Sequence, residues 1–196
     1  HHFYRRIPTN VNNDGDSSDH VDVATMSLGG NGNPDDSMSL AVDNSVSLGV
    51  VHTIAAGNSG PGLSTINSPG TSKNAITVAA ACAPHGDLLP STCTQPITSF
   101  SSRGPLIWNG VDLKKPDIAA PGAMICAARW DNSFPYTCFD SSHARISGTS
   151  MATPHIAGVV ALLRQAYSTY TPAQIKDLIK GTARNLGMTY NDQGAG

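Results

Sequence analysis

The chain of 196 residues has an ordinary globular composition, with 39% hydrophobic and 13% charged residues. Its length suits one domain with a sizeable core. The formal net charge of −2 gives no electrostatic reason to bind nucleic acid or an acidic membrane surface. No apolar run approaches the roughly 20 residues that a transmembrane helix needs. The sequence therefore predicts neither a nucleic-acid-binding protein nor a membrane protein.

Both ends of the chain look like internal positions of a longer protein. Residues 1–20 are polar and show no period, which predicts a surface loop or the edge of a fragment. The chain opens with His1-His2-Phe3-Tyr4, without an initiator Met or a signal segment. It stops directly after a turn rich in Asn and Gly. We therefore expect an internal fragment whose folded part begins at residue 21.

From residue 21 onward, apolar spacing predicts strands and helices in turn. Val21 to Met26 form a short strand that Gly29-Gly30 ends. Asn33 to Asp36 then start a helix with apolar residues at helical spacing, which Gly49 caps. Compact apolar runs at 50–56 and 75–81 predict two buried strands.

The second half of the chain continues this pattern. Shorter strands are predicted at 97–100, 117–120, 124–128 and 144–147, and helices at 150–167 and from Thr171-Pro172 to residue 183. Because the apolar runs do not alternate with polar residues, we expect a sheet covered on both faces. The order of elements predicts an α/β fold with a doubly wound, mostly parallel sheet and helices on both faces.

The segment with the clearest chemistry is Gly148-Thr149-Ser150-Met151-Ala152-Thr153-Pro154-His155. It places Ser150 in the first turn of a helix, where unpaired backbone N–H groups favour the negative charge that forms when a serine attacks a carbonyl. The small residues around Ser150 leave room for a substrate backbone. We expect Pro154 to be tolerated because the first turn has no N–H bond to lose. A serine at a helix start is, by itself, more often an N-cap.

This eight-residue string resembles, without a mismatch, the nucleophile signature of the subtilisin family of serine proteases, the subtilases. It differs from the G-x-S-x-G elbow of α/β-hydrolases, because Ala152 stands at the second glycine. Two further stretches, 99–105 and 115–122, also resemble the family, and the resemblance covers roughly residues 21–196. It implies that residues 21–196 are the C-terminal portion of a single subtilisin-like catalytic domain.

Two more segments resemble parts of the subtilase site. Ala55 to Gly60 resembles the oxyanion segment, in which Asn58 would donate to the tetrahedral oxyanion. The alternative for Asn58 is an ordinary turn asparagine. Ser27-Leu28-Gly29-Gly30 resembles the strand that pairs with extended substrate, and its alternative is a strand end with a flexible glycine pair. Together with Ala56-Gly57, this strand is expected to line the substrate channel.

The rest of a Ser-His-Asp triad is missing from this sequence. The Asp-Ser/Thr-Gly and His-Gly-Thr-His motifs of the family do not occur here. Asp14-Gly15-Asp16 and Asp19-His20 lie too close to Ser27 to replace them. We also do not assign the catalytic base to His52, His85, His143 or His155.

The resemblance therefore implies a serine endopeptidase acting on peptides or proteins, of which this chain holds only Ser150 and Asn58. A histidine and an aspartate would come from outside the sequence, from a complementary N-terminal segment. The chain alone is expected to be inactive. Two alternatives stay open: a catalytically inactive peptide-binding module, and one half of a split protease.

The four cysteines form two local pairs, Cys82 with Cys93 and Cys126 with Cys138. Disulfides between these neighbours would suit a secreted, extracellular protein, although four cysteines allow three connectivities and free thiols remain the alternative. The spacing is too wide for a typical zinc site.

The resemblance also raises the question of structural calcium. Asp117 lies where some subtilases use a carboxylate together with backbone carbonyls near Lys73 and Ala75, and calcium prefers such oxygens. A single aspartate is more often a capping or solvated residue. We expect no catalytic metal and no required cofactor, and leave structural calcium open.

Overall fold

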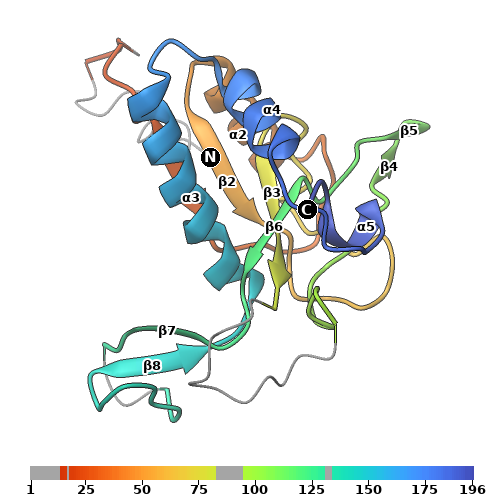
Figure 1. Ribbon diagram of the computed structural model, residues 1–196. Coiled ribbons are helices and arrows are strands. Elements are labelled where there is room, and N and C mark those ends of the chain that lie inside the picture. Colours follow the sequence, from red (N-terminus) through yellow and green to blue (C-terminus); the bar gives the residue numbers. More distant parts are fainter. Residues whose placement is uncertain (1–13, 17, 83–94, 131–133) are drawn as a thin grey trace.

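The computed structural model describes residues 14–16, 18–82, 95–130 and 134–196 (Figure 1). Its centre is a four-stranded sheet in which all neighbouring strands are parallel. The strands lie in the order β1 (Val23–Met26), β2 (Val51–Ala55), β3 (Ile76–Ala81) and β6 (Ile118–Pro121). Every residue of β2 and β3 is buried, which explains why their sequences are continuous apolar runs rather than alternating ones.

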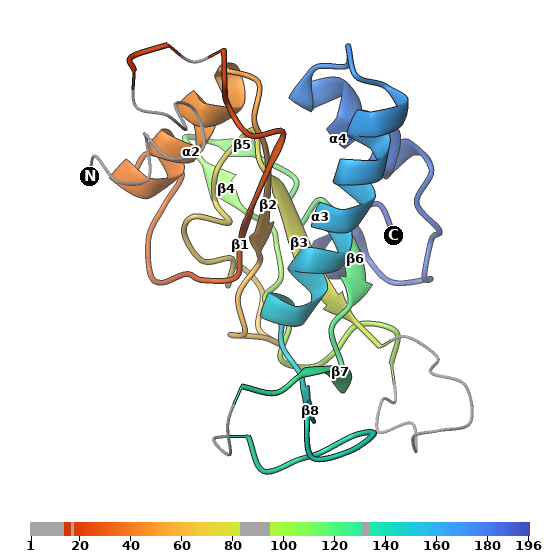
Figure 2. The ribbon, with the colours of Figure 1, turned by 90° about the vertical axis from the view of Figure 1, so that its left-hand side faces the viewer.

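Helices cover both faces of this sheet, as Figure 2 shows with the sheet seen nearly edge-on. Helix α2 (Ser37–Ser47) packs on one face, where Val42 and Val46 meet Met26 and Ile54. Helices α3 (Thr149–Ala166) and α4 (Pro172–Gly181) pack on the other face in a larger core. That core contains Val51, Ile76, Val78, Ala80, Ile118, Ala120, Ala152, Ile156, Val160, Ile175 and Ile179. The predicted doubly wound α/β fold is confirmed.

The helix boundaries follow from capping residues that the sequence contains. The Asp36 side chain accepts hydrogen bonds from the N–H groups of Met38 and Ser39 and so starts α2. Gly49, with a φ of 107°, ends the turn after this helix. At α4, the Thr171 and Gln174 side chains form a capping box, and Pro172 occupies the first turn.

Several elements differ from the sequence expectation. No strand forms over 97–100, because the chain turns there, and Ile97 makes only an isolated bridge to Ala81. The predicted strands near 124–128 and 144–147 are β7 (Ile125–Ala128) and β8 (His143–Ile146), which pair antiparallel outside the central sheet. A small hairpin of β4 (Ile107–Trp108) and β5 (Val111–Asp112), and helix α5 (Tyr190–Gln193), were not expected. These short elements lack a periodic apolar pattern.

The disulfide prediction is confirmed for Cys126 and Cys138. Cys82 is also disulfide-bonded, but its predicted partner Cys93 lies outside the described residues. In the described part of the chain, no helix is both long and apolar enough to cross a membrane.

His52 is a fully buried side chain in the middle of β2, with 1% of its surface exposed. Its Nε2 lies 2.8 Å from the Ser45 Oγ, whereas its Nδ1 is buried without a hydrogen-bond partner. Burial lowers the pKa of His52 to about 4, although the nearby Asp43 acts in the opposite direction. The folded protein therefore holds this imidazole neutral at pH values where an exposed histidine is charged.

This burial predicts a loss of stability in mild acid. Between pH 6.5 and 4 the unfolded chain binds a proton at His52 and the folded chain does not, so the free energy of unfolding falls as the pH falls. The loss attributable to His52 is up to about 3 kcal/mol. Urea unfolding of the wild-type protein and of His52→Asn, at several pH values, checks this. The variant should lose less stability over this range, and parallel losses in both proteins would contradict the prediction.

Candidate active site

Ser150 lies at the start of α3, beside the carboxyl ends of the parallel strands. Ser27 follows directly after β1, and its carbonyl oxygen accepts a hydrogen bond of 3.4 Å from the Ser150 Oγ. In return, the Ser27 Oγ donates a hydrogen bond of 2.8 Å to the Ser150 carbonyl oxygen. In open α/β sheets, ligands bind at the carboxyl ends of the strands. Two segments that are 123 residues apart in sequence are thus held together at the predicted nucleophile.

Pro154 explains why the Ser150 carbonyl is available to Ser27. Pro154 lies inside α3 rather than in its first turn, so the expectation that it has no helical hydrogen bond to lose is wrong. Because proline has no N–H, it cannot donate to the carbonyl four residues earlier, which is that of Ser150. The Ser27 hydroxyl takes this place.

Asn58 lies in the loop after β2, and Thr149 fixes the orientation of its side chain. The Asn58 Oδ1 accepts hydrogen bonds from the Thr149 N–H at 2.9 Å and from the Thr149 Oγ1 at 3.0 Å. Because a backbone N–H can only donate, the amide atom that faces Thr149 is the oxygen Oδ1 and not the nitrogen Nδ2. The Asn58 Nδ2 donors are therefore directed away from Thr149.

The Asn58 amide and the Ser150 backbone N–H lie around the same point in space. A β-carbon built on Gly148 would be 3.6 Å from both the Asn58 Nδ2 and the Ser150 N. Both are hydrogen-bond donors, and the start of α3 adds the partial positive charge of a helix N-terminus. This arrangement is suited to stabilise an oxygen that becomes negatively charged next to Ser150.

The predicted substrate-binding residues come from two segments, Ser27 to Gly30 after β1 and Ala56-Gly57 after β2. Ser27, Leu28 and Gly29 are exposed, and Ser27 contacts Ser150. Gly30 exchanges two backbone hydrogen bonds with Ser68, at 2.9 and 3.0 Å. Their role in binding stays a prediction.

Ala56 and Gly57 lie in the segment after β2 that leads to Asn58, and their predicted role in lining a substrate channel stays a prediction. Ala56 is fully buried, and both of its backbone groups are hydrogen-bonded, to Val78 and Asn67. Gly57 has a φ of 107°, and a β-carbon there would come within 2.7 Å of the side chains of Asn67 and Ser102. Only glycine fits this position without strain, so Gly57 sets the turn that presents Asn58.

None of the described histidines is hydrogen-bonded to Ser150. The Nδ1 of His155 lies 2.8 Å from the Met151 carbonyl oxygen, and that of His143 lies 2.8 Å from the Asp140 carboxylate. His20 contacts the Val21 carbonyl oxygen, and His52 is buried against Ser45. His85, which was also considered, lies outside the described residues. Within the described part of the chain, Ser150 has no general base.

Comparison with known proteins agrees with this geometry. The family model described as the subtilase family, Peptidase_S8, matches residues 6–196. The chain belongs to the subtilase family. It is 38% identical over 195 residues to the serine protease AprX of Bacillus subtilis. This match covers 94% of this chain and 43% of AprX. It is 34% identical to a subtilisin of Bacillus pumilus, covering 88% of this chain and 53% of the relative.

Solved structures give the same result. A protease from Pseudoalteromonas arctica matches with a TM-score of 0.67 and 31% identity, over 91% of this chain and 49% of that one. A cold-adapted subtilisin-like serine proteinase matches with a TM-score of 0.60 and 30% identity, over 88% of this chain and 54% of the other. The subtilase chain thus spans 43–54% of the length of these four relatives.

The residues around Asp117 in this subtilase do not fit a calcium ion. The ammonium groups of Lys115 and Lys176 donate to the Asp117 carboxylate at 2.6 and 2.9 Å. Both ammonium groups also donate to the Ala75 carbonyl oxygen at 2.8 Å. A divalent cation at these oxygens would face two positive charges. Structural calcium at another position stays a prediction.

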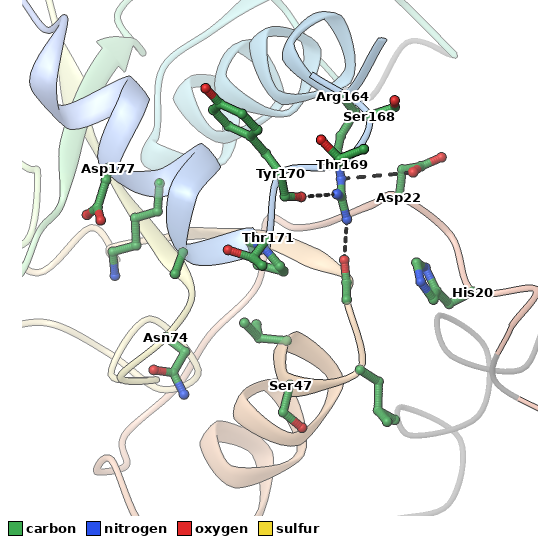
Figure 3. A pocket seen from close by; sticks show the side chains of 16 residues that line it. His20, Asp22, Ser47, Asn74, Arg164, Ser168, Thr169, Tyr170, Thr171 and Asp177 are labelled. Carbon is green, nitrogen blue, oxygen red and sulfur yellow. Dashed lines mark hydrogen bonds and ion pairs between the residues drawn. The ribbon is translucent and has the colours of Figure 1, made fainter. Parts of the chain in front are cut away.

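A pocket of about 710 Å³, shown in Figure 3, lies at the amino ends of the strands. Asp22, Gly49 and Asn74, which precede β1, β2 and β3, line it. Its most prominent cation, Arg164, donates to the carbonyl oxygens of Tyr170 and Gly49 and lies 3.9 Å from Asp22. Because these groups stabilise the chain itself, we do not assign the pocket a catalytic role.

Proposed function

We propose that the protein is a serine endopeptidase in which Ser150 is the nucleophile. The Ser150 Oγ forms a bond to the carbonyl carbon of the scissile peptide, and its proton passes to a histidine outside this sequence. That histidine then protonates the leaving amine as the C–N bond breaks. Water hydrolyses the resulting acyl-enzyme by the reverse sequence of proton transfers.

The observation that carries this proposal is the pair of donors around Gly148. The Asn58 Nδ2 and the Ser150 N are each 3.6 Å from the position that a β-carbon on Gly148 would occupy. The Asn58 amide is held in place by Thr149. A binding protein has no need for such an arrangement next to a serine hydroxyl. In catalysis it would stabilise the oxyanion of the tetrahedral intermediate.

The catalytic histidine and aspartate are proposed to come from a complementary N-terminal segment. In support, the chain spans 43% of AprX, and Ser150 has no histidine partner within the described residues. Substrates are proposed to be peptides or proteins, with Ser27 to Gly29 forming backbone hydrogen bonds to an extended chain.

Secretion is part of the same proposal. It is supported by the disulfide between Cys126 and Cys138, because such bonds persist in oxidising compartments. A relative from Xanthomonas campestris, 36% identical over 181 residues, is named an extracellular protease.

Labelling with a fluorophosphonate probe tests the proposed function. In the full-length protein the probe should label Ser150 within minutes, as identified by mass spectrometry, because only an activated serine reacts quickly. Ser150→Ala should abolish labelling, whereas Ser168→Ala, which removes an exposed hydroxyl beyond the C-terminal end of α3, is the control. The isolated chain of 196 residues should label slowly. Equally slow labelling of both proteins would favour the peptide-binding module, and fast labelling only after mixing two chains would favour the split protease.

A further inference from the structure

Residues 124–130 and 134–147, called the disulfide hairpin below, project beyond the carboxyl end of the central sheet (Figures 1 and 2). Its strands β7 and β8 pair over four residues each, and the disulfide joins Cys126 in β7 to Cys138 in the returning segment. On the other side of β8, the Arg145 N–H donates to the Tyr136 carbonyl oxygen at 2.9 Å. The hairpin is therefore braced on both sides of β8.

Four aromatic side chains of this hairpin are exposed. They are Trp130, Phe134, Tyr136 and Phe139, with exposed fractions of 95%, 41%, 67% and 75%. The whole chain has 2 Trp, 5 Tyr and 4 Phe, so more than a third of its aromatic residues lie in this short stretch. Since they contribute little to the core, their concentration indicates an interaction surface.

Both ends of the disulfide hairpin are attached to the nucleophile segment. The Met124 N–H donates to the Ser147 Oγ at 2.8 Å, and the Gly148 N–H donates to the Gly122 carbonyl oxygen at 2.8 Å. Strand β8 ends at Ile146, only four residues before Ser150. The position of the hairpin is thus fixed relative to the reacting hydroxyl.

The disulfide hairpin and the segment Ser27 to Gly29 leave opposite edges of the central sheet. The hairpin continues from β6, whereas Ser27 follows β1, and these strands are the two outer strands of the described sheet. A substrate whose acyl side pairs with Ser27 to Gly29 would therefore extend its leaving-group side toward the hairpin.

We propose that the four hairpin aromatics bind apolar side chains on the leaving-group side of an extended polypeptide substrate. This inference rests on the proposed function of Ser150. A strand rises about 3.4 Å per residue, so β8 places the aromatic residues within reach of a substrate that extends about four residues past the scissile bond. Exposed Trp and Tyr side chains supply much of the affinity of interfaces, and a braced hairpin loses little conformational freedom on binding.

The described part of the hairpin carries the charged side chains Arg129, Asp140 and Arg145 beside its aromatic residues. The Asp140 carboxylate is paired with His143 at 2.8 Å, and the His143 ring stacks edge-on against Phe139 at 5.9 Å between centroids. The Asp140 carboxylate is thus engaged by His143, while the four aromatic side chains stay exposed.

The test is to measure hydrolysis by the full-length protein carrying Tyr136→Ser and Phe139→Ser. For a peptide with five apolar residues after the scissile bond, KM should rise about tenfold. For a short peptide p-nitroanilide, which has no residues on that side, kcat/KM should be unchanged. Val111→Ser is the matched control, because Val111 is 58% exposed on the β4–β5 hairpin and lies away from Ser150.

An unchanged KM for the long peptide would overturn the inference and leave the proposed function intact. An equal rise in KM for peptides extended only on the acyl side would also overturn it. Self-association of the wild-type protein that disappears in the double variant, without a change in KM, would overturn it as well. If the wild-type protein cleaves neither substrate, the proposed function fails. The hairpin is then judged by fluorescence anisotropy of the labelled long peptide, which the double variant must bind more weakly than the wild-type protein.

Discussion

Replacement of Ser150 by Ala in the full-length protein is expected to lower kcat for peptide hydrolysis by about a millionfold, the loss known for the nucleophile of the relative subtilisin. Among the described residues, the Ser27 Oγ contacts Ser150, but it donates its proton to the Ser150 carbonyl oxygen and is not free to act as a nucleophile. Because the Asn58 amide and the backbone N–H groups remain, a small activity above the uncatalysed rate should persist. Steady-state hydrolysis of a peptide p-nitroanilide measures both rates.

Asn58→Ala is the graded control for this experiment. It removes the Nδ2 donor while the Ser150 hydroxyl stays, so kcat should fall by about 10²- to 10³-fold, with KM changed little. The substitution also removes the Asn58 Oδ1, which accepts hydrogen bonds from Thr149 at the start of α3. Thermal unfolding should therefore confirm that the variant stays folded. If Ser150→Ala kept one per cent of the activity or more, another residue would be the nucleophile.

Replacement of Asp117 by Asn is expected to lower the free energy of unfolding by about 3–5 kcal/mol, because it leaves buried ammonium groups without their counter-ion. The Asp117 side chain is 2% exposed and the Lys115 side chain is 0% exposed. Burial by itself would raise the pKa of Asp117, but the adjacent Lys115 and Lys176 ammonium groups hold it below its ordinary value. The carboxylate also accepts the Thr77 N–H at 2.8 Å, which ties it to β3.

The pKa of Lys115 in this cluster depends on the charge of Asp117. Burial lowers the pKa of Lys115 to about 7, and the Asp117 charge is the strongest influence in the opposite direction. Without that charge, Lys115 would be still easier to deprotonate. Part of the loss in Asp117→Asn should therefore be recovered as the pH rises from 6 to 8, since the neutral amine needs no counter-ion.

Urea unfolding at several pH values tests this prediction against a surface pair. Asp35 contacts Lys73 at 2.8 Å, but the two side chains are 43% and 41% exposed. Asp35→Asn should change the free energy of unfolding by about 1 kcal/mol or less. Equal effects of the two substitutions would show that the Asp117 cluster contributes no more than an exposed ion pair.

The sequence alone determined the features that depend on neighbouring residues. The apolar runs of β2 and β3 predicted buried strands, and the residues Asp36 and Thr171 predicted where two helices begin, because caps and periodicity act over a few positions. The string around Ser150 placed a serine at a helix start. The Ala55 to Gly60 stretch likewise placed Asn58 in a loop after a strand.

Only the tertiary structure decided how these parts meet. Thr149 orients Asn58 across a separation of 91 residues, and Ser27 replaces the hydrogen bond that Pro154 withholds from Ser150. Lys176 of α4 contacts Asp117, directly before β6, at the position where the sequence suggested calcium. Strand β7 pairs with β8 as a hairpin instead of joining the sheet. Such contacts depend on how strands and helices pack, which no local pattern specifies, because their partners come from distant parts of the chain.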